Sequence, residues 1–304
     1  MMFVRSLVAV SVGAISLAAG SLHDAFSADQ AYAYTAQVAG LGERPPGSVG
    51  HQKTQDLIRQ ILKKNGATID SDDFVAKTPR GDVAVHNIIG KFNVTADPNQ
   101  KIFILAGHYD TLFKRGFIGA NDGASSTAIL LAFADALAGQ KTKMQIWLVW
   151  TDLEEAIQSF AGDDGLYGSR HLAQKLKANG MAPRVKGLFL LDMIGDRNLN
   201  VGRETKSTRW LQDFIAQAAK QLGYSQYFFQ YDTEIIDDHV SFLEVGIPAV
   251  DVVDAEFGRM GPGLDGMGEF HHANTDTMDK VSKTSLEIVG RTILLTVELI
   301  DKAA

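Results

Sequence analysis

The stretch that decides the fold is Ile102-Phe103-Ile104-Leu105 followed by Ala106-Gly107-His108-Tyr109-Asp110 and, after a short loop, Gly119-Ala120-Asn121-Asp122-Gly123-Ala124-Ser125. The apolar run predicts a buried strand, and the Ala- and Leu-rich residues 127–137 predict a helix after the loop. His108, Asp110 and Asp122 therefore lie at the C-terminal end of a core strand. Ligands bind at that edge of open α/β sheets, so this stretch predicts one half of a ligand or metal site.

Strands and helices alternate through the rest of the chain. This alternation predicts a single α/β domain over residues 28–304, with a mixed, mostly parallel β-sheet flanked by helices on both faces. Residues 201–202 and 257–268 are predicted to be mobile loops, the second at the rim of the site. The predicted strands are 68–76, 83–92, 102–106, 145–151, 187–191 and 249–253, the first two as a hairpin beside the main sheet. The predicted helices are 31–40, 51–65, 125–138, 169–179, 208–222, 239–245 and 284–302.

The composition narrows the classes of function. The chain has 304 residues, of which 45% are hydrophobic and 21% charged, as is usual for a folded soluble protein. A net charge of −7 without a cluster of Lys and Arg argues against nucleic acid as a partner. The chain has no Cys, which excludes disulfides, thiolate ligands and a Cys nucleophile. Any metal must be held by His and carboxylates.

The N-terminus has the pattern of a secretory signal peptide over residues 1–27. Arg5 provides a positive charge, residues 7–20 form an apolar core, and Ala25-Phe26-Ser27 matches a cleavage site. The alternative is a membrane anchor, but the apolar core is too short to span a bilayer comfortably. We therefore expect export to the periplasm or the medium, with no membrane span in the mature form.

Polar residues also gather at the ends of other predicted strands and at the starts of helices. In a sheet of this kind, such residues converge on one crevice. Zinc binds imidazole nitrogen and carboxylate oxygen, and catalytic sites keep one position open. Of two adjacent Glu side chains, one can bind the metal while the other acts as general base or acid. The further clusters are Asp152-Leu153-Glu154-Glu155, Asp192, Asp237-Asp238-His239 and His271-His272.

Each cluster also has a structural interpretation. A Glu-Glu pair often only begins a solvated helix, but Glu154 and Glu155 follow an apolar strand, which favours a functional role. Asp110 is either a turn cap or the residue that orients His108. Asp192 is either an N-cap or a site residue. The other histidines are interpreted as peripheral: His271 as a packing or rim residue, His239 and His171 as structural or supporting residues, and His23, His51 and His86 without a role.

Taken together, these motifs resemble the zinc-dependent M28 peptidase family, which includes aminopeptidases and animal-type glutaminyl-peptide cyclotransferases. The resemblance spans about residues 45–299 and implies a zinc-exopeptidase fold. It depends on His108-Tyr109-Asp110, Gly119-Ala120-Asn121-Asp122, Asp152-Leu153-Glu154-Glu155-Ala156, Leu191-Asp192-Met193-Ile194-Gly195, Asp238-His239 with Gly246-Ile247-Pro248, and His272-Ala273-Asn274-Thr275-Asp276-Thr277.

The resemblance implies that Asp122, Glu155 and His272 hold one zinc ion. In the aminopeptidases Asp122 would bridge to a second zinc ion held by His108 and Asp192. Cyclotransferases keep these residues but use one zinc ion, so the ligands alone do not separate the two activities.

For catalysis, the resemblance implies Glu154 as general base. In the cyclotransferases, Asp192 and Asp238, the second residue of the Asp237-Asp238 pair, would join its proton network. Phe160 stands where animal cyclases carry a pocket Trp.

Several motifs lean toward the cyclotransferase branch, and three features depart from it. The motifs are Arg44-Pro45-Pro46-Gly47-Ser48, Phe74 with Thr78-Pro79-Arg80-Gly81, the run from Gly165 to Ala173, and the doubled Asp before His239. Leu153 replaces the usual Gly, His271 replaces a Trp, and the animal disulfide is absent.

Three functions follow. The first is a secreted one-zinc glutaminyl cyclase, which converts the N-terminal Gln of peptides or proteins to pyroglutamate and releases ammonia. The second is a two-zinc aminopeptidase in which Glu154 activates a water molecule. The third is a non-catalytic binding domain, which would be expected to lack a ligand or Glu154, and the sequence lacks neither.

Overall fold

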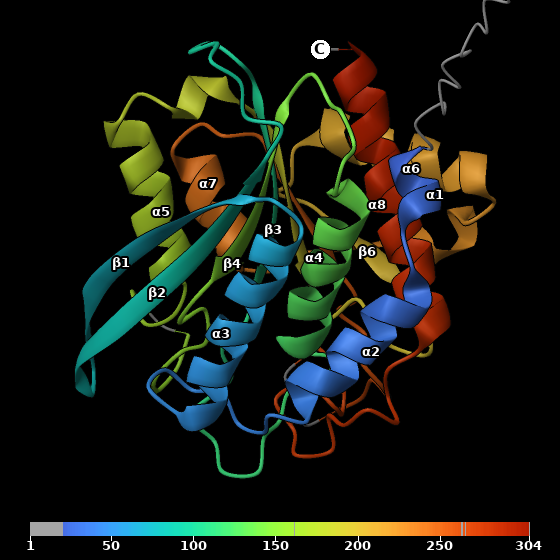
Figure 1. Cartoon of the computed structure of the whole chain (residues 1–304). Coiled ribbons are helices and arrows are strands. Elements are labelled where there is room, and N and C mark those ends of the chain that lie inside the picture. Colours follow the sequence, from blue (N-terminus) through green and yellow to red (C-terminus); the bar gives the residue numbers. More distant parts are fainter. Residues whose placement is uncertain (1–20, 161, 263, 265, 304) are drawn as a thin grey trace, which may run out of the picture.

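The computed structural model describes residues 21–160, 162–262, 264 and 266–303, and a six-stranded sheet lies at its centre (Figure 1). The strand order is β1-β2-β4-β3-β5-β8, with β3, β4, β5 and β8 parallel. The strands are β1 Thr68–Thr78, β2 Gly81–Phe92, β3 Ile102–His108, β4 Gln145–Thr151, β5 Val185–Asp192, β6 Val201–Glu204, β7 Phe228–Thr233 and β8 Ala249–Val253. The α-helices are α1 Leu22–Ala25, α2 Ala28–Ala39, α3 Val49–Lys64, α4 Ala124–Leu137, α5 Tyr167–Ala178, α6 Arg209–Leu222, α7 Asp238–Glu244 and α8 Lys283–Ala303.

Helices cover both faces of the sheet, as the apolar strands require. Every residue of β3 is buried, and its side chains alternate between two apolar clusters. Phe103 and Leu105 pack in the cluster that contains α4 and α8. Ile104 and Ala106 pack in the cluster that contains residues of α5 and α7. Figure 1 shows α4 and α5 on opposite sides of the sheet, so the predicted two-sided α/β fold is confirmed.

The strand order places a crevice at the carboxyl end of β3. The chain passes from β3 through α4 to its neighbour β4, and then through α5 to β5 on the other side of β3. Such a reversal, with helices leaving to opposite faces, leaves space for a ligand between the loops that follow the strands. The predicted site residues belong to these loops.

The predicted hairpin of β1 and β2 is confirmed, and because β2 pairs with β4, the hairpin extends the six-stranded sheet at one edge. One other sequence prediction was wrong. Residues 201–202 do not form a loop but belong to β6, which pairs with β7 in a small parallel sheet. The four residues of β6, Val-Gly-Arg-Glu, form no apolar or alternating pattern, and the partner strand lies more than twenty residues away.

The N-terminal segment contributes to the core. Residues 1–20 of the predicted signal peptide lie outside the described residues, and export stays a prediction. Leu22 and Phe26 are buried, and Ser27 accepts a hydrogen bond from the amide of Gln30 as the N-cap of α2. Cleavage after Ser27 would remove α1 and these contacts, and the cleavage point stays a prediction. In the described part of the chain, no helix is long and apolar enough to cross a membrane.

Replacing Phe26 tests this packing. Its ring lies 5.6 Å from that of Phe133, and a Cβ added at Gly290 of α8 would come within 2.2 Å of it. Phe26→Ala should therefore lower the free energy of unfolding by about 3 kcal/mol, measured by urea denaturation. Val49→Ala, at a side chain that is 71% exposed, is the control and should change it little. An unchanged stability of Phe26→Ala would show that α1 is dispensable.

Candidate active site

The loops at the carboxyl edge of the sheet bring most of the predicted residues to one cavity of about 540 Å³. His108 ends β3, Asp192 ends β5, and Asp122 lies just before α4. Glu154 and Glu155 follow β4. The cavity is lined by Asp122, Glu154, Phe160, Asp192, Thr233, Glu234, Ile235, Ile236, Asp237, Ala255, Gly266, Met267, His271 and His272. Residues 266 and 267 thus confirm that the loop before His272 contributes to the rim; residues 263 and 265 of that loop are not described.

Asp122 and Glu155 each have a carboxylate oxygen close to Nε2 of His272. Among the described residues, however, the possible ligand atoms that lie within 4.8 Å of one another at this place are those of Asp122, His271 and His272, and Glu155 is not among them. His272 Nε2 lies 3.1 Å from Glu155 Oε2 and 3.6 Å from Asp122 Oδ2. Ligand atoms of a tetrahedral zinc ion are about 3.4 Å apart. Asp122 Oδ2 and both carboxylate oxygens of Glu155 are buried without a hydrogen-bond partner among the described residues. Because buried carboxylate oxygens normally have partners, these three orphan atoms fit a cation.

A second set of ligand atoms shares Asp122. His108 Nε2 lies 3.2 Å from Asp122 Oδ1 and 3.2 Å from Asp192 Oδ1, and the three ligand atoms lie within 4.8 Å of one another. Asp122 thus presents one oxygen to each set, as a bridging carboxylate does. Burial opposes a charge on His108, but Asp110, Asp122 and Asp192 outweigh it and raise its pKa. This set can accommodate either a second metal or an imidazolium.

His271 lies close to the proposed ligands. Its ligand atom lies within 4.8 Å of those of Asp122 and His272. The rings of His271 and His272 are stacked, with centroids 3.7 Å apart and an angle of 26° between planes. His271 is thus placed both to line the cavity and to offer a nitrogen to a metal, and its rim role stays a prediction. The backbone of His272 has φ +52°, which explains how two consecutive rings come to lie face to face.

Asp237, not Asp238, faces the cavity. Burial raises the pKa of Glu154 well above its usual range, and the nearby charge of Asp237 raises it further. Burial also raises the pKa of Asp237, with Asp192 as the next cause. Asp238 is fully buried and accepts a hydrogen bond of 2.5 Å from the hydroxyl of Thr151. Asp237 is therefore the member of the pair that lines the cavity beside Glu154, and the predicted part of Asp238 in the proton network stays a prediction.

Asp110 holds the two glutamates in place. Its carboxylate accepts hydrogen bonds from the backbone amides of Glu154, at 3.2 Å, and Glu155, at 3.3 Å. One oxygen also lies 3.6 Å from His108 Nδ1, which is the distance of an ion pair and not of a hydrogen bond, so the orienting role stays a prediction. The link to the glutamate backbone was not predicted, because it joins two loops 44 residues apart.

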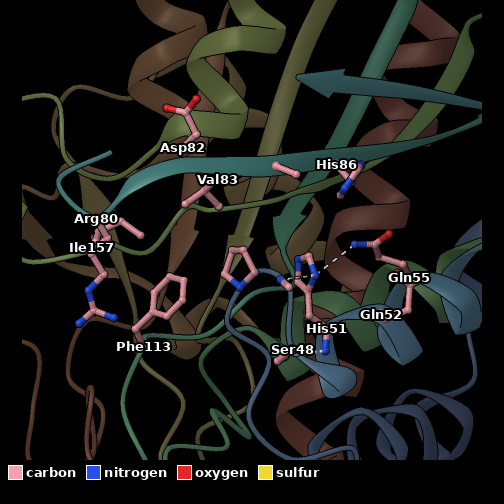
Figure 2. A pocket seen from close by; sticks show the side chains of 13 residues that line it. Ser48, His51, Gln52, Gln55, Arg80, Asp82, Val83, His86, Phe113 and Ile157 are labelled. Atoms are coloured by element: carbon pink, nitrogen blue, oxygen red, sulfur yellow. Dashed lines mark hydrogen bonds between the residues drawn. The ribbon is translucent and has the colours of Figure 1, made fainter. Parts of the chain in front are cut away.

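His51, expected to have no role, anchors the same loop from the other side. Its Nε2 lies 2.7 Å from Asp152 Oδ1, and both side chains are buried. The other oxygen of Asp152 accepts a hydrogen bond from the backbone amide of His86. Figure 2 shows His51 in the wall of a second cavity, of about 340 Å³, between the start of α3 and the β1–β2 hairpin. No sequence signal distinguishes this His, because its partner lies 101 residues away.

Two other predicted residues occupy different surroundings. Phe160 is 46% exposed at the mouth of the cavity, where it can contact a substrate. His239 is fully buried, and its Nε2 lies 3.2 Å from Glu204 Oε2. It therefore links α7 to the end of β6 and does not line the cavity.

Comparisons with known proteins agree with this geometry. Residues 87–297 match the model of peptidase family M28. The chain belongs to the M28 peptidase family. It is similar to the glutaminyl-peptide cyclotransferases of Boiga irregularis (30% identity over 285 residues) and Bos taurus (29% over 281 residues); each alignment covers 80% of this chain and 76% of the relative. It also resembles the crystal structure of the Acidobacteriales bacterium glutaminyl cyclase, with a TM-score of 0.87 and 35% identity over 98% of this chain and 100% of that one.

Leu153 is the departure from the M28 motif with a visible structural cost. It has φ +54°, where glycine is favoured and other residues are strained by about 1–2 kcal/mol. Its side chain is fully buried in a small cluster with Ala76, Val85 and Ile157. The side chain thus ties the loop before Glu154 to the hairpin, which offsets the strain.

Leu153→Gly should separate these two effects. Glycine removes the strain but deletes a buried side chain, whose loss costs more than the strain. We expect the free energy of unfolding to fall by about 2 kcal/mol in urea denaturation. Asn93→Gly, at a position with φ +55° outside the apolar clusters, is the matched control and should be neutral or stabilising. A more stable Leu153→Gly would mean that strain dominates at this position.

Proposed function

We propose that this M28 protein is a glutaminyl-peptide cyclotransferase, which converts the N-terminal Gln of peptides to pyroglutamate and releases ammonia. The observation that supports an N-terminal Gln as the substrate is the similarity to glutaminyl cyclases over nearly the whole chain. The cavity supports it, because it joins a metal-ligand set to an unbound glutamate. A non-catalytic domain would not need to retain this complete set.

We propose zinc as the metal, held by Asp122, Glu155 and His272. This set of one imidazole and two carboxylates suits zinc. When bound, zinc supplies Lewis-acid polarisation of the side-chain amide carbonyl of the substrate Gln. Burial, together with the charge of Asp122, raises the pKa of Glu155 to about 7 in the absence of a metal. A cation would therefore displace a proton there, and zinc binding should strengthen as the pH rises.

Glu154 is the proposed proton carrier. The α-amine nitrogen of the substrate forms a bond with the side-chain amide carbon and loses a proton to Glu154. The bond from that carbon to the amide nitrogen then breaks, and Glu154 returns the proton to the departing ammonia. A raised pKa suits this role, because a group that takes and returns a proton works best with a pKa near the working pH. Confinement of amine and amide in one cavity favours ring closure.

Asp192 and Asp237 flank Glu154 and adjust its protonation. Negative charges beside a carboxylate favour its protonated form. At the mouth of the cavity, Phe160 and Ile236 are 46% and 64% exposed. These two apolar side chains are placed to contact the residues that follow the N-terminal Gln.

An aminopeptidase is the second candidate. The observation that favours it is the intact set of His108, Asp122 and Asp192, which could hold a second metal ion. In the cyclase, His108 would instead donate a hydrogen bond from Nε2 to one of these carboxylates. The two functions differ in metal content and product.

Metal content and product analysis therefore test the proposal together. We expect one zinc ion per chain by elemental analysis, and ammonia release from a Gln-initiated peptide with a free amino terminus. Glu154→Gln should retain the zinc but lose at least about 100-fold in turnover. Two zinc ions, with free leucine released from a Leu-initiated peptide, would identify an aminopeptidase instead.

The pH dependence of Asp237→Asn and Asp238→Asn tests which residue acts beside Glu154. Because ionised Glu154 is the active base, activity falls as the pH drops through its pKa. The charge of Asp237 raises that pKa, so Asp237→Asn should lower it and move the acidic limb of kcat/KM to lower pH. Its kcat should fall at least about tenfold. Asp238→Asn should move the acidic limb of kcat/KM by less. A larger shift for Asp238→Asn than for Asp237→Asn would assign to Asp238 the role beside Glu154.

A further inference from the structure

Arg44 is a fully buried cation, and among the described residues its guanidinium has no hydrogen bond to a carboxylate. Its guanidinium donates to four backbone carbonyls instead: those of Gly42, Tyr109, Ile118 and Gly119, at distances of 3.2, 3.1, 2.6 and 3.0 Å. Burial of a charge is costly unless hydrogen bonds compensate for the lost water, and these four carbonyls provide that compensation. Two of the four carbonyls begin the segment that ends at Asp122.

Asp276 binds the other end of the same segment through its amides. Its two oxygens accept hydrogen bonds from the backbone N–H groups of Asn121, at 2.8 Å, and Asp122, at 3.0 Å. Asp276 is fully buried and belongs to the loop that carries His272. Burial and the charge of Asp122 raise its pKa to about 7, although both amides and Arg44 stabilise the ionised form.

Residues 118–122 therefore lie between opposite charges. The buried guanidinium of Arg44 donates hydrogen bonds to the carbonyls at the start of the segment, and the buried carboxylate of Asp276 accepts hydrogen bonds from the amides at its end. Each end of the segment therefore presents the backbone group that suits the charge beside it. Gly119 permits the tight turn, since it has φ +48° and an added Cβ would come within 2.2 Å of the carbonyl oxygen of Asp122. The segment cannot shift without breaking hydrogen bonds at both ends.

We propose that Arg44 and Asp276 form a clamp on residues 118–122 that positions Asp122 to bind the metal. Neither side chain is itself a ligand. The clamp also joins three parts of the site, because Arg44 fixes the carbonyl of Tyr109, beside His108, while Asp276 lies four residues after His272. This inference rests on the proposed metal site but not on the choice of substrate.

The guanidinium adds a second effect. Asp110, Asp122, Glu155 and Asp276 all lie close enough to raise the pKa of Arg44, which burial lowers to about 10. The permanent positive charge therefore reduces repulsion among these carboxylates when no metal is bound. A preformed set of ligands binds a metal more tightly than one that must first be assembled.

Zinc affinity measured on the full chain tests the clamp. Metal-free protein is titrated with zinc against a chromophoric chelator, at a temperature well below its own melting temperature. We expect Arg44→Met and Asp276→Asn each to weaken zinc binding by about 10- to 100-fold, the usual effect of losing a group that orients a metal ligand. Arg44→Lys keeps the charge but not the fork of donors, and should remain at least about tenfold weaker than the wild type.

The double variant distinguishes a clamp from two independent contacts. Once one end of the segment is released, loss of the other should matter less. The combined loss should therefore be smaller than the product of the single losses. A fully multiplicative loss, or single variants with wild-type zinc affinity, would overturn the proposal.

Two matched variants control for general destabilisation. Arg184 also donates its guanidinium to a backbone carbonyl, that of Gln100. Asp254 is a buried carboxylate that accepts two backbone amides and has a pKa raised by burial to about 7. Arg184→Met and Asp254→Asn should lower the melting temperature without weakening zinc binding. An equal loss of affinity in these controls would overturn the clamp.

The outcomes also separate this proposal from the function. A wild-type protein that binds zinc but releases no ammonia from Gln-initiated peptides would refute the proposed cyclase function. The clamp would then still be decided by the zinc affinities of the variants. A wild type that binds no zinc would overturn both. If Arg44→Met does not fold, Asp276→Asn decides by the same measurement.

Discussion

The concentration of negative charge at the end of β3 is the constraint on which the site depends. Asp110, Asp122, Glu155 and Asp237 are all buried, and buried carboxylates repel one another and resist ionisation. Backbone amides, imidazoles and the buried guanidinium of Arg44 stabilise the ionised carboxylates by hydrogen bonds and positive charge. Where these donors are lacking, at Asp122 Oδ2 and at Glu155, the orphan oxygens leave a place for a metal ion.

Strained backbone accompanies this arrangement. Leu153, Met193 and His272 all have φ near +50°, and each is itself a proposed ligand or stands beside a site residue. Strained residues persist only where the surrounding packing holds them. Buried contacts at Leu153 and Met193 and the ring stack at His272 supply that packing. These contacts thus hold the loops in the backbone conformations that present the site residues.

One scaffold accommodates two chemistries because the ligands of the second metal set are also useful without a metal. His108 can bind a second ion or, protonated, supply a positive charge between the same carboxylates. The ligands by themselves therefore do not separate a cyclase from an aminopeptidase.

The sequence by itself determined the six strands of the central sheet, most of the helices and the edge of the sheet where the site lies, because apolar periodicity reports burial directly; β4 and β8 were predicted at their observed bounds. Only the tertiary structure decided that Asp237 rather than Asp238 faces the cavity, since neighbouring residues at a helix start point in different directions. It alone revealed β6 and β7 and the contacts of Arg44, His51 and Asp276, whose partners lie up to 155 residues away. Such contacts depend on how elements pack, which no local pattern records.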